Sequence, residues 1–328
     1  MSEKIIVIGS NSFSGASFVP CSIDAGFEVV GVSRSEEPNP VFLPYKYSGE
    51  GIEFHQLDLN HDLDKIMALI NAKKPEYVVN FSAQSMVAQS WDHPDHWFKT
   101  NVVSTIQFHD QLRHCDFLKK YVHISTPEVY GSCEGYIKES NSYYPSTPYA
   151  VSRAAADMSL KTYYDSYQFP VVFTRAANVY GPGQQLYRII PRTILFIKMG
   201  KRLQLHGGGT SERSFIHMQD VSDATLRIMK EGSSGEIFHI ATNDSITIRN
   251  LVEMICELMN VNFEDHVDVA EERLGKDSAY LLDSTKIRNT LGWKDQVLLK
   301  EGVMSVLQWI EKNLDILKQQ PFDYIHKA

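Results

Sequence analysis

Cysteine is scarce in this chain, and its few positions form no recognisable pattern. Only four cysteines occur among 328 residues, and none belongs to a C-x-x-C pair. The sequence therefore favours buried or incidental thiols over disulfides or a thiolate metal site. Three neighbouring histidines also lack ligand spacing, so no metal is expected. The cysteines are Cys21, Cys115, Cys133 and Cys256, and the histidines are His109, His114 and His123.

Long apolar runs are also missing. No segment approaches the roughly 20 apolar residues that a membrane-spanning helix needs. The first residues, M-S-E-K-I-I-V-I-G, lead into a strand-like pattern without the arrangement of a signal peptide. We therefore expect a cytoplasmic protein that does not associate with membranes.

Positive charge is in deficit as well. The chain has 32 Lys and Arg against 40 Asp and Glu, a net charge of −8. This balance argues against a nucleic-acid or anionic-membrane surface. Hydrophobic content of 43% and charged content of 22% are ordinary for a globular enzyme. A phosphate-bearing ligand would have to be met by local basic groups.

Short apolar runs alternate with helix-like stretches through the first half of the chain. Continuous apolar strands are typical of parallel sheets buried on both faces, and the alternation indicates βαβ units. We predict an α/β fold with a Rossmann-type doubly wound parallel sheet. Predicted strands are Ile5–Ile8, Val29–Val32, Phe54–Leu57, Tyr77–Phe81, Tyr121–Ile124 and Val171–Thr174; predicted helices are 14–25, 61–73, 94–114 and 148–167.

The composition of the sequence changes after Asn178, where loops become rich in glycine and polar residues. We predict a sheet-forming domain over residues 1–175 and a smaller α/β substrate lobe over 176–328, with some lobe segments returning to the sheet. Residues 34–51 are expected to form a polar, mobile loop. Further helices are predicted at 219–231, 247–259 and 299–313.

A glycine-containing turn, G-S-N-S-F-S-G, follows the first strand. Gly9 would permit the tight turn, and Gly15 would let the next helix pack against the strand. A phosphate at that helix N-terminus would meet free N–H groups and the positive end of the helix dipole. We therefore predict that residues 1–175 bind NAD(P), with Ser12 and Phe13 in the binding turn. An ordinary strand-to-helix connection is the alternative.

The ends of the next three strands supply further candidates. V-G-V-S-R-S places Ser33 and Arg34 where a carboxylate would select NAD, so NADP is favoured over NAD. A solvated loop position is the alternative for Arg34. Asp58, at the end of the third strand, could accept a hydrogen bond from the adenine amino group. The remaining candidates are Leu59, Ser82 and Ala83 for the cofactor and Ser85 for the substrate.

A hydroxyl, a carboxylate and a phenol follow the fifth strand. S-T-P-E-V-Y-G contains Thr126 and Glu128, and P-Y-A-V-S-R contains Tyr149 and Arg153. The last two are four residues apart and share one helix face. A cation there stabilises the phenolate, so Tyr149 would lose its proton closer to neutral pH. The set indicates redox chemistry on an alcohol with a further proton to move.

Taken in order along the chain, these motifs resemble the extended short-chain dehydrogenase/reductase family, specifically its nucleotide-sugar 4,6-dehydratases and epimerases. The resemblance spans nearly the whole chain and includes A-N-V-Y-G-P-G, S-F-I-H-M-Q-D-V and L-L-D-S-T-K-I-R-N-T-L-G-W-K. N-F-S-A-Q-S-M-V is particularly similar to the GDP-mannose branch, whose cofactor is NADP. A GDP-linked hexose is favoured on that ground.

The resemblance implies a role for each catalytic candidate. Tyr149 would take the proton of the sugar 4-hydroxyl as hydride leaves C4, and Thr126 would hydrogen-bond that hydroxyl. Glu128 would remove the C5 proton once C4 is a ketone. Water would leave from C6 and hydride would return there, which yields a 4-keto-6-deoxy sugar.

Two positions depart from the family pattern. Pro127 stands where the dTDP-glucose branch has an aspartic acid that protonates the departing hydroxyl, so Glu128 would serve as both base and acid. Arg153 stands where the family has lysine; it keeps the charge but is not interchangeable with lysine. It could bind the nicotinamide ribose and lower the pKa of Tyr149. A family epimerase, reductase or decarboxylase, or a decayed dinucleotide-binding module, remains the alternative.

The resemblance also implies contacts for the substrate and for a second subunit. Asn178 and Arg213 match residues that hold the sugar diphosphate, and a guanidinium fork suits that contact. Arg192, Arg273 and Asp277 are weaker candidates. Relatives form homodimers through helices that match 94–114 and 148–167, in a four-helix bundle.

Overall fold

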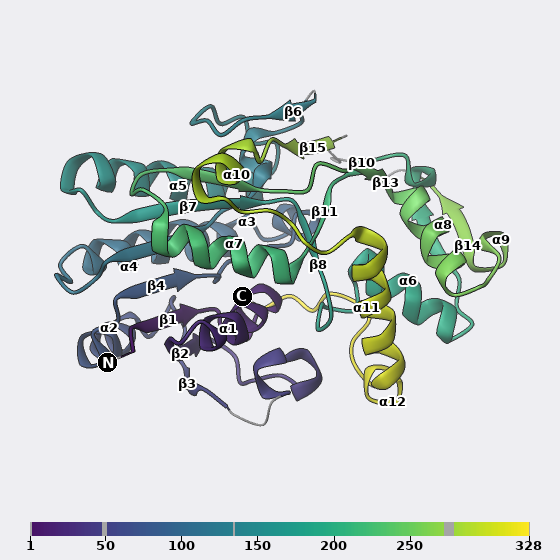
Figure 1. Cartoon of the computed structure of the whole chain (residues 1–328), viewed down its shortest axis with the longest axis horizontal. Helices are drawn as coiled ribbons and strands as arrows, with labels where there is room; N and C mark the ends of the chain where they lie inside the picture. Colours follow the sequence, from purple (N-terminus) through teal and green to yellow (C-terminus); the bar gives the residue numbers. More distant parts are fainter. Residues whose placement is uncertain (1, 48–50, 134, 272–278, 328) are drawn as a thin grey trace.

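The computed structural model describes residues 2–47, 51–133, 135–271 and 279–327. Its largest element is a sheet of seven parallel strands (Figure 1). Chain order reverses beside β1, and ligands of such sheets bind at the carboxyl edge next to that reversal. In spatial order the strands are β12 (Ile237–Ile240), β7 (Val171–Ala176), β5 (Lys120–Ile124), β4 (Tyr77–Asn80), β1 (Lys4–Ile8), β2 (Glu28–Ser33) and β3 (Glu53–Gln56).

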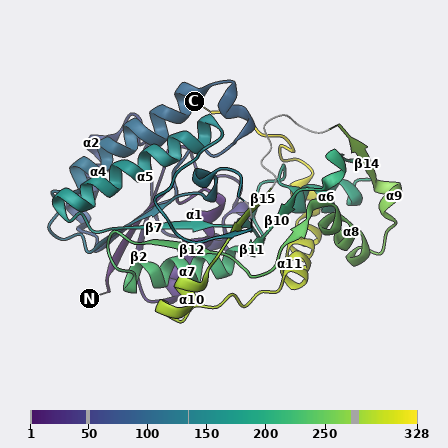
Figure 2. The same cartoon turned by 90° about the horizontal axis from the view of Figure 1, so that it is seen from above.

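Helices cover both faces of this sheet (Figure 2). Strand β1 shows why, because its side chains alternate between two hydrophobic clusters. Ile5 and Val7 belong to the cluster on the side of α1 (Phe13–Asp24) and α7 (Met218–Glu231). Ile6 and Ile8 belong to the other, on the side of α2, α4 and α5. The predicted Rossmann-type sheet is confirmed. The second set of helices spans Leu63–Lys73 (α2), Thr105–Leu112 (α4) and Pro148–Tyr167 (α5).

The elements that follow residue 175 belong to two different parts of the molecule. β12 and α7 join the layers of the large sheet, whereas α6, α8, α9, α11 and α12 gather at the other end of the molecule (Figures 1 and 2). A separate hydrophobic cluster includes Leu251, Ile255 and Val306 from α8 and α11. The boundary at residue 175 stays a prediction. These helices span Ile189–Lys198 (α6), Ile248–Leu258 (α8), Phe263–His266 (α9), Leu299–Lys312 (α11) and Leu314–Leu317 (α12).

Short strands and one more helix complete the second half. β10 lies between β13 and β15, and β15 also pairs with β6, so this small sheet joins distant segments. β8 pairs with β11, and β9 pairs with β14. The elements are β6 (Tyr136–Ile137), β8 (Asn178–Tyr180), β9 (Leu203–His206), β10 (Glu212–Arg213), β11 (Phe215–His217), β13 (Ile246–Thr247), β14 (Val267–Ala270), β15 (Ala279–Leu282) and α10 (Thr285–Leu291).

Two local predictions lack details that the structure adds. The polar, mobile loop expected over 34–51 contains two 3₁₀ turns, Pro40–Phe42 and Pro44–Lys46, which bury Leu43 and Tyr45 in the core. The helix expected over 94–114 runs without a break from Pro94 to Leu112 and is therefore confirmed, but it contains a π-helical turn, Lys99–Ser104, between α3 (Pro94–Phe98) and α4. Of the helices that the structure describes, none is long and apolar enough to cross a membrane.

Candidate active site

The turn between β1 and α1 is tightly built. Gly9 has φ +83°, and a Cβ there would lie 2.8 Å from the Ser82 nitrogen. A Cβ at Gly15 would lie 2.2 Å from the Gly9 carbonyl oxygen, so neither position has room for a side chain. Ser12 caps α1, since its hydroxyl accepts from the Gly15 N–H at 3.1 Å and donates to the Gly9 carbonyl at 2.7 Å. The first turn of α1 thus faces the carboxyl edge beside β4.

Two predicted cofactor residues contribute their side chains to the core instead. Phe13 belongs to the cluster between the sheet and α7, and Leu59 belongs to the cluster on the opposite face. Only their backbone groups remain for a ligand.

Hydroxyl and basic groups gather at the end of β2. Ser33 accepts a hydrogen bond from the Asn11 backbone N–H at 3.1 Å. The Arg34 guanidinium is partly exposed and donates to the Lys327 carbonyl oxygen at 3.3 Å. Asp58 lies beyond β3 and accepts from the Asn60 N–H at 2.8 Å, so its carboxylate closes its own turn.

The segment after β4 is held by two asparagines. Ser82 donates its hydroxyl to the Asn80 side-chain oxygen at 2.6 Å. Gln84 is buried, and its backbone exchanges hydrogen bonds with the Asn101 side chain at 2.8 and 3.0 Å. Ala83 is partly exposed and Ser85 exposed. Gln84 and Asn101 were missed by the sequence analysis, since their pairing depends on where the π-helical turn packs.

The catalytic candidates come together where β5 faces α5. Thr147 caps α5 by accepting from the Ala150 N–H at 3.2 Å, which places Tyr149 in the first helical turn. Thr126 caps the 3₁₀ turn Pro127–Tyr130, accepts from the Glu128 N–H at 3.4 Å and hydrogen-bonds the Tyr149 phenol. The hydroxyl, carboxylate and phenol predicted from separate motifs therefore share one small volume.

The groups around Tyr149 have opposing effects on the pKa of its phenol. Burial raises the pKa of Tyr149 most, and the Glu128 carboxylate raises it further. Arg153, the Thr126 hydrogen bond and Arg188 lower the pKa of Tyr149 but do not outweigh burial. The net shift is upward, contrary to the expectation from Arg153 alone, because desolvation disfavours the phenolate. Arg188 precedes α6 and was missed, as nothing local in its sequence marks it.

Arg153 is directed toward the sheet. Its guanidinium is buried, donates to the Ile124 carbonyl oxygen and lies 3.4 Å from the His123 Nε2 atom. Its Nε atom is buried and has no hydrogen-bond partner among the residues described. Arg153 therefore ties α5 to β5, in addition to its charge acting on Tyr149.

A fully buried ion network continues this helix face. Asp157 follows Arg153 by one turn and accepts from Ser125 at 2.7 Å and from Arg175 at 2.8 Å. His123 Nε2 lies 3.3 Å from the other carboxylate oxygen. Burial alone would raise the pKa of Asp157, but Arg175 and the hydrogen bonds outweigh it and hold that pKa at about 2. The spacing of 149, 153 and 157 could have identified Asp157.

The substrate candidates lie on other elements. Asn178 begins β8 with its side chain exposed, and Arg213 lies on β10, where it donates to the Glu212 carbonyl at 2.7 Å. Arg192, on α6, donates to the Phe322 carbonyl at 3.3 Å and to Asp323 at 3.2 Å. The remaining two candidates, Arg273 and Asp277, lie outside the described residues.

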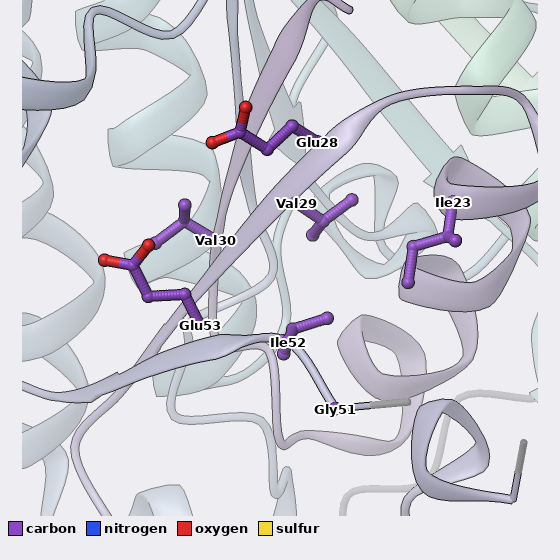
Figure 3. Close-up of a pocket in the computed structure, with 7 residues that line it drawn as sticks. All are labelled: Ile23, Glu28, Val29, Val30, Gly51, Ile52 and Glu53. Atoms are coloured by element: carbon purple, nitrogen blue, oxygen red, sulfur yellow. The ribbon is translucent and has the colours of Figure 1, made fainter. Parts of the chain in front are cut away.

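A groove of about 280 Å³ lies away from these groups. Figure 3 shows Glu28 and Glu53 pointing away from Ile23 there. Both glutamates begin their strands, so the groove is at the amino end of β2 and β3, opposite Ser33. The groove therefore lies at the edge of the sheet opposite the β1–α1 turn, away from the predicted dinucleotide site.

Comparison with known proteins matches nearly the whole chain. The family model described as GDP-mannose 4,6 dehydratase matches residues 6–306. The Bos taurus dTDP-D-glucose 4,6-dehydratase is 33% identical over 254 residues, 76% of this chain and 71% of that protein.

Solved structures agree with this match. Streptomyces venezuelae DesIV, a dTDP-glucose 4,6-dehydratase crystallised with NAD and TYD bound, is 28% identical, with a TM-score of 0.88 over 95% of this chain and 98% of that one. The Thermotoga maritima UDP-glucose 4-epimerase with UDP-glucose is 25% identical, with a TM-score of 0.86 over 95% and 99% of the two chains.

Proposed function

The chain belongs to the GDP-mannose 4,6 dehydratase family of extended short-chain dehydrogenases/reductases, and we propose that it is a nucleotide-sugar 4,6-dehydratase. The observation that carries this proposal is the meeting of Thr126, Glu128 and Tyr149 between β5 and α5. One hydroxyl, one carboxylate and one phenol are the groups needed to oxidise an alcohol and then remove a neighbouring proton.

The three residues divide the work by their chemistry. A bound nicotinamide dinucleotide supplies the acceptor, and later the donor, of hydride. Tyr149 accepts the proton of the sugar 4-hydroxyl, which Thr126 orients by hydrogen bonding. Glu128 removes the C5 proton, made acidic by the C4 ketone, and returns a proton to the C6 hydroxyl as it leaves as water. The product also needs a proton at C5 once hydride has reached C6, and the proton that Tyr149 accepted, after exchange with solvent, balances it.

Pro127 occupies the position at which the dTDP-glucose branch has the aspartic acid that protonates the departing hydroxyl. It occupies the first position of the 3₁₀ turn, where its missing N–H is not needed. Since Pro127 has no proton to give, Glu128 is the acid as well as the base in this proposal. A family epimerase, which eliminates no water, is the alternative that Pro127 favours.

The residues at the β1–α1 turn fit a dinucleotide. Gly9 and Gly15 have no room for side chains, and the first turn of α1 offers N–H groups to a pyrophosphate. Arg34 and Ser33 at the β2 end favour NADP through a 2′-phosphate. The NAD bound to DesIV makes NAD the competing choice.

The nucleotide and the assembly are parts of the same proposal. A GDP-hexose is favoured by N-F-S-A-Q-S-M-V, and the dTDP-glucose named for two relatives is the competing substrate. Homodimerisation through the helical segment 94–112 and α5 is supported by exposed apolar side chains on α3, the π-helical turn and α5, namely Phe98, Val103, Val151 and Met158.

Mass spectrometry in heavy water tests the proposed reaction. The protein is incubated with GDP-, UDP-, dTDP- and CDP-hexoses, and loss of one water with deuterium retained at C5 is expected for one nucleotide. Glu128→Gln should abolish water loss and leave cofactor affinity unchanged. Glu257→Gln, an exposed position on α8, is the matched control. A product of unchanged mass that chromatography separates from the substrate would establish the epimerase instead, and no conversion in any mixture would refute both.

A further inference from the structure

Residues 321–327, here called the strap, run back from the end that carries α11 and α12 to the large sheet (Figures 1 and 2). Alternate side chains are partly buried, and these are Phe322, Tyr324 and His326. The side chains between them are exposed. This period of two is typical of extended chain that lies with one side against a surface.

The near end of the strap is held by α6 and the loop before it. Arg192 donates to the carbonyl and the side chain of successive strap residues at 3.3 and 3.2 Å. The Phe322 ring packs edge-on against Phe196, and the Tyr324 ring packs edge-on against Tyr187. An arginine expected to meet the substrate thus holds the chain itself.

The far end lies across the carboxyl edge of the sheet. The Lys327 carbonyl oxygen accepts from the Gln84 side-chain amide at 2.6 Å and from the Arg34 guanidinium at 3.3 Å. Gln84 follows β4 and Arg34 follows β2, and β1 lies between these strands. Neighbouring strands are about 4.8 Å apart, so one carbonyl bridges donors from both sides of β1. Lys327 therefore lies in front of the Gly9 turn.

Stacked imidazoles fasten the strap beside this bridge. The His326 ring lies 5.1 Å from His96, 5.3 Å from His93 and 5.1 Å from Trp97, each within 10° of parallel. His96 Nδ1 and His326 Nε2 are 2.8 Å apart and share a hydrogen bond. The strap thereby joins α3 to the tip of β2.

We propose that the strap competes with the adenosine half of the dinucleotide for the carboxyl edge, and that protonation of His326 releases it. This inference rests on the proposed dinucleotide site. Its argument is chemical, because the Lys327 carbonyl oxygen uses two donors that a phosphate or ribose oxygen would use there. The cofactor must displace the strap before those donors can reach it.

The direction of the pH effect follows from the charges around His326. The stack places the His326 ring beside His93 and His96 with Arg34 nearby, so a positive charge on His326 is disfavoured while the strap is closed. Burial lowers the pKa of His326 below its ordinary 6.5, and His96, His93 and Arg34 add to this against the opposing charge of Asp95. Tyr324 offers its hydroxyl to His326 at 3.3 Å and carries no charge near neutrality. The closed strap binds fewer protons than the open one, so it is stable above pH 6.5 and weakens as pH falls below it.

Calorimetric titration of the full chain with NAD and with NADP tests the competition. A strap closed about nine-tenths of the time reduces apparent affinity about tenfold. His326→Leu, and separately a chain ending at Gln320, should therefore bind the preferred dinucleotide about tenfold more tightly at pH 8. At pH 5.5 the advantage should shrink, since the unaltered strap opens by itself. Ile325→Ser is the matched control, because this neighbour is 64% exposed and points away from the stack.

Hydrogen exchange of residues 321–327 supplies a readout that does not depend on affinity. Faster exchange of the strap on adding dinucleotide supports displacement, whereas slower exchange would overturn it in favour of a lid that closes over the cofactor. Equal affinities for His326→Leu, the shortened chain and the control would also refute the proposal. If no form binds a dinucleotide, the proposed cofactor site fails. The strap's protection factor, which is its exchange rate corrected for the intrinsic rate at each pH, then tests the role of His326: a factor that falls between pH 8 and 5.5 supports it, and a constant factor refutes it.

Discussion

The two ends of the carboxyl edge are built differently. At the β5–α5 end, Thr126, Tyr149 and Arg153 are buried and held by helix caps and backbone carbonyls. At the β2 end, Arg34 is partly exposed, and its partner is the strap. The proposed proton-transfer groups are therefore held by the protein itself, whereas in our inference Arg34 exchanges the strap for the cofactor. Chemistry needs fixed geometry, and binding tolerates replacement of a partner.

Tyr149→Phe should remove the proposed general base of the β5–α5 end without disturbing the packing of the ring. Loss of one general base should lower turnover about 10²–10⁴-fold, with dinucleotide affinity changed less than about twofold. Because the pKa of Tyr149 is raised by burial and by Glu128, turnover of the unaltered protein should increase with pH above neutrality. Steady-state rates from pH 6 to 10 measure both effects. Unchanged turnover in the phenylalanine variant would remove Tyr149 from the mechanism.

Asp157→Asn should lower the stability of the protein, because it removes one charge from the buried ion network at the same end. Removing this charge leaves Arg175, which is fully buried, without its ion partner, and such losses are worth about 3–5 kcal/mol of stability. Asp165→Asn is the matched control on the same helix, since its ion pair with Lys161 is exposed and should contribute less than about 1 kcal/mol. Urea unfolding at pH 7 measures both.

The pH dependence of that difference follows from the pKa of Asp157, which is lowered from 3.8 to about 2. A lowered carboxyl pKa contributes stability that is fully present above pH 3.8 and is lost as pH falls through 2. The gap between the unaltered protein and Asp157→Asn should narrow between pH 4 and 2. A gap that stays constant there would show that ionisation of Asp157 is not its source.

Arg34→Ala tests the β2 end, where the expected effect is smaller. If Arg34 meets a 2′-phosphate, the loss of a charge-assisted contact should weaken NADP binding about tenfold more than NAD binding. The strap complicates this reading, because the same substitution removes its bond to the Lys327 carbonyl. That second effect is equal for both dinucleotides and cancels in the ratio of their affinities. A ratio unchanged by the substitution contradicts the predicted preference for NADP.

The two ends also differ in how far the sequence predicts them. Thr126, Glu128 and Tyr149 belong to short motifs next to a strand and a helix start, so the sequence identifies each motif, and the family resemblance implies that they act together. The contact of Gln84 with Lys327 joins residues 243 positions apart, and no local pattern marks such a pair. β12 was also missed, because Ile237–Ile240 has four residues and lies beyond the expected sheet-forming half. Periodicity predicts elements, whereas tertiary packing decides which of them meet.

Ser12→Ala should have the smallest effect, on the turn that lies between the two ends. The Ser12 hydroxyl accepts from the Gly15 N–H and donates to the Gly9 carbonyl, so it both caps α1 and closes the turn. Loss of such a cap is worth about 1 kcal/mol in the free energy of unfolding. Ser17→Ala is the matched control, since that hydroxyl only bonds back to the Phe13 carbonyl within α1 and should change stability by less than about 0.5 kcal/mol. Equal stability of the two variants in urea would show that the Ser12 hydroxyl does not hold the turn, in contrast to the β5–α5 end, where the side chains of Thr126 and Thr147 cap the local helices.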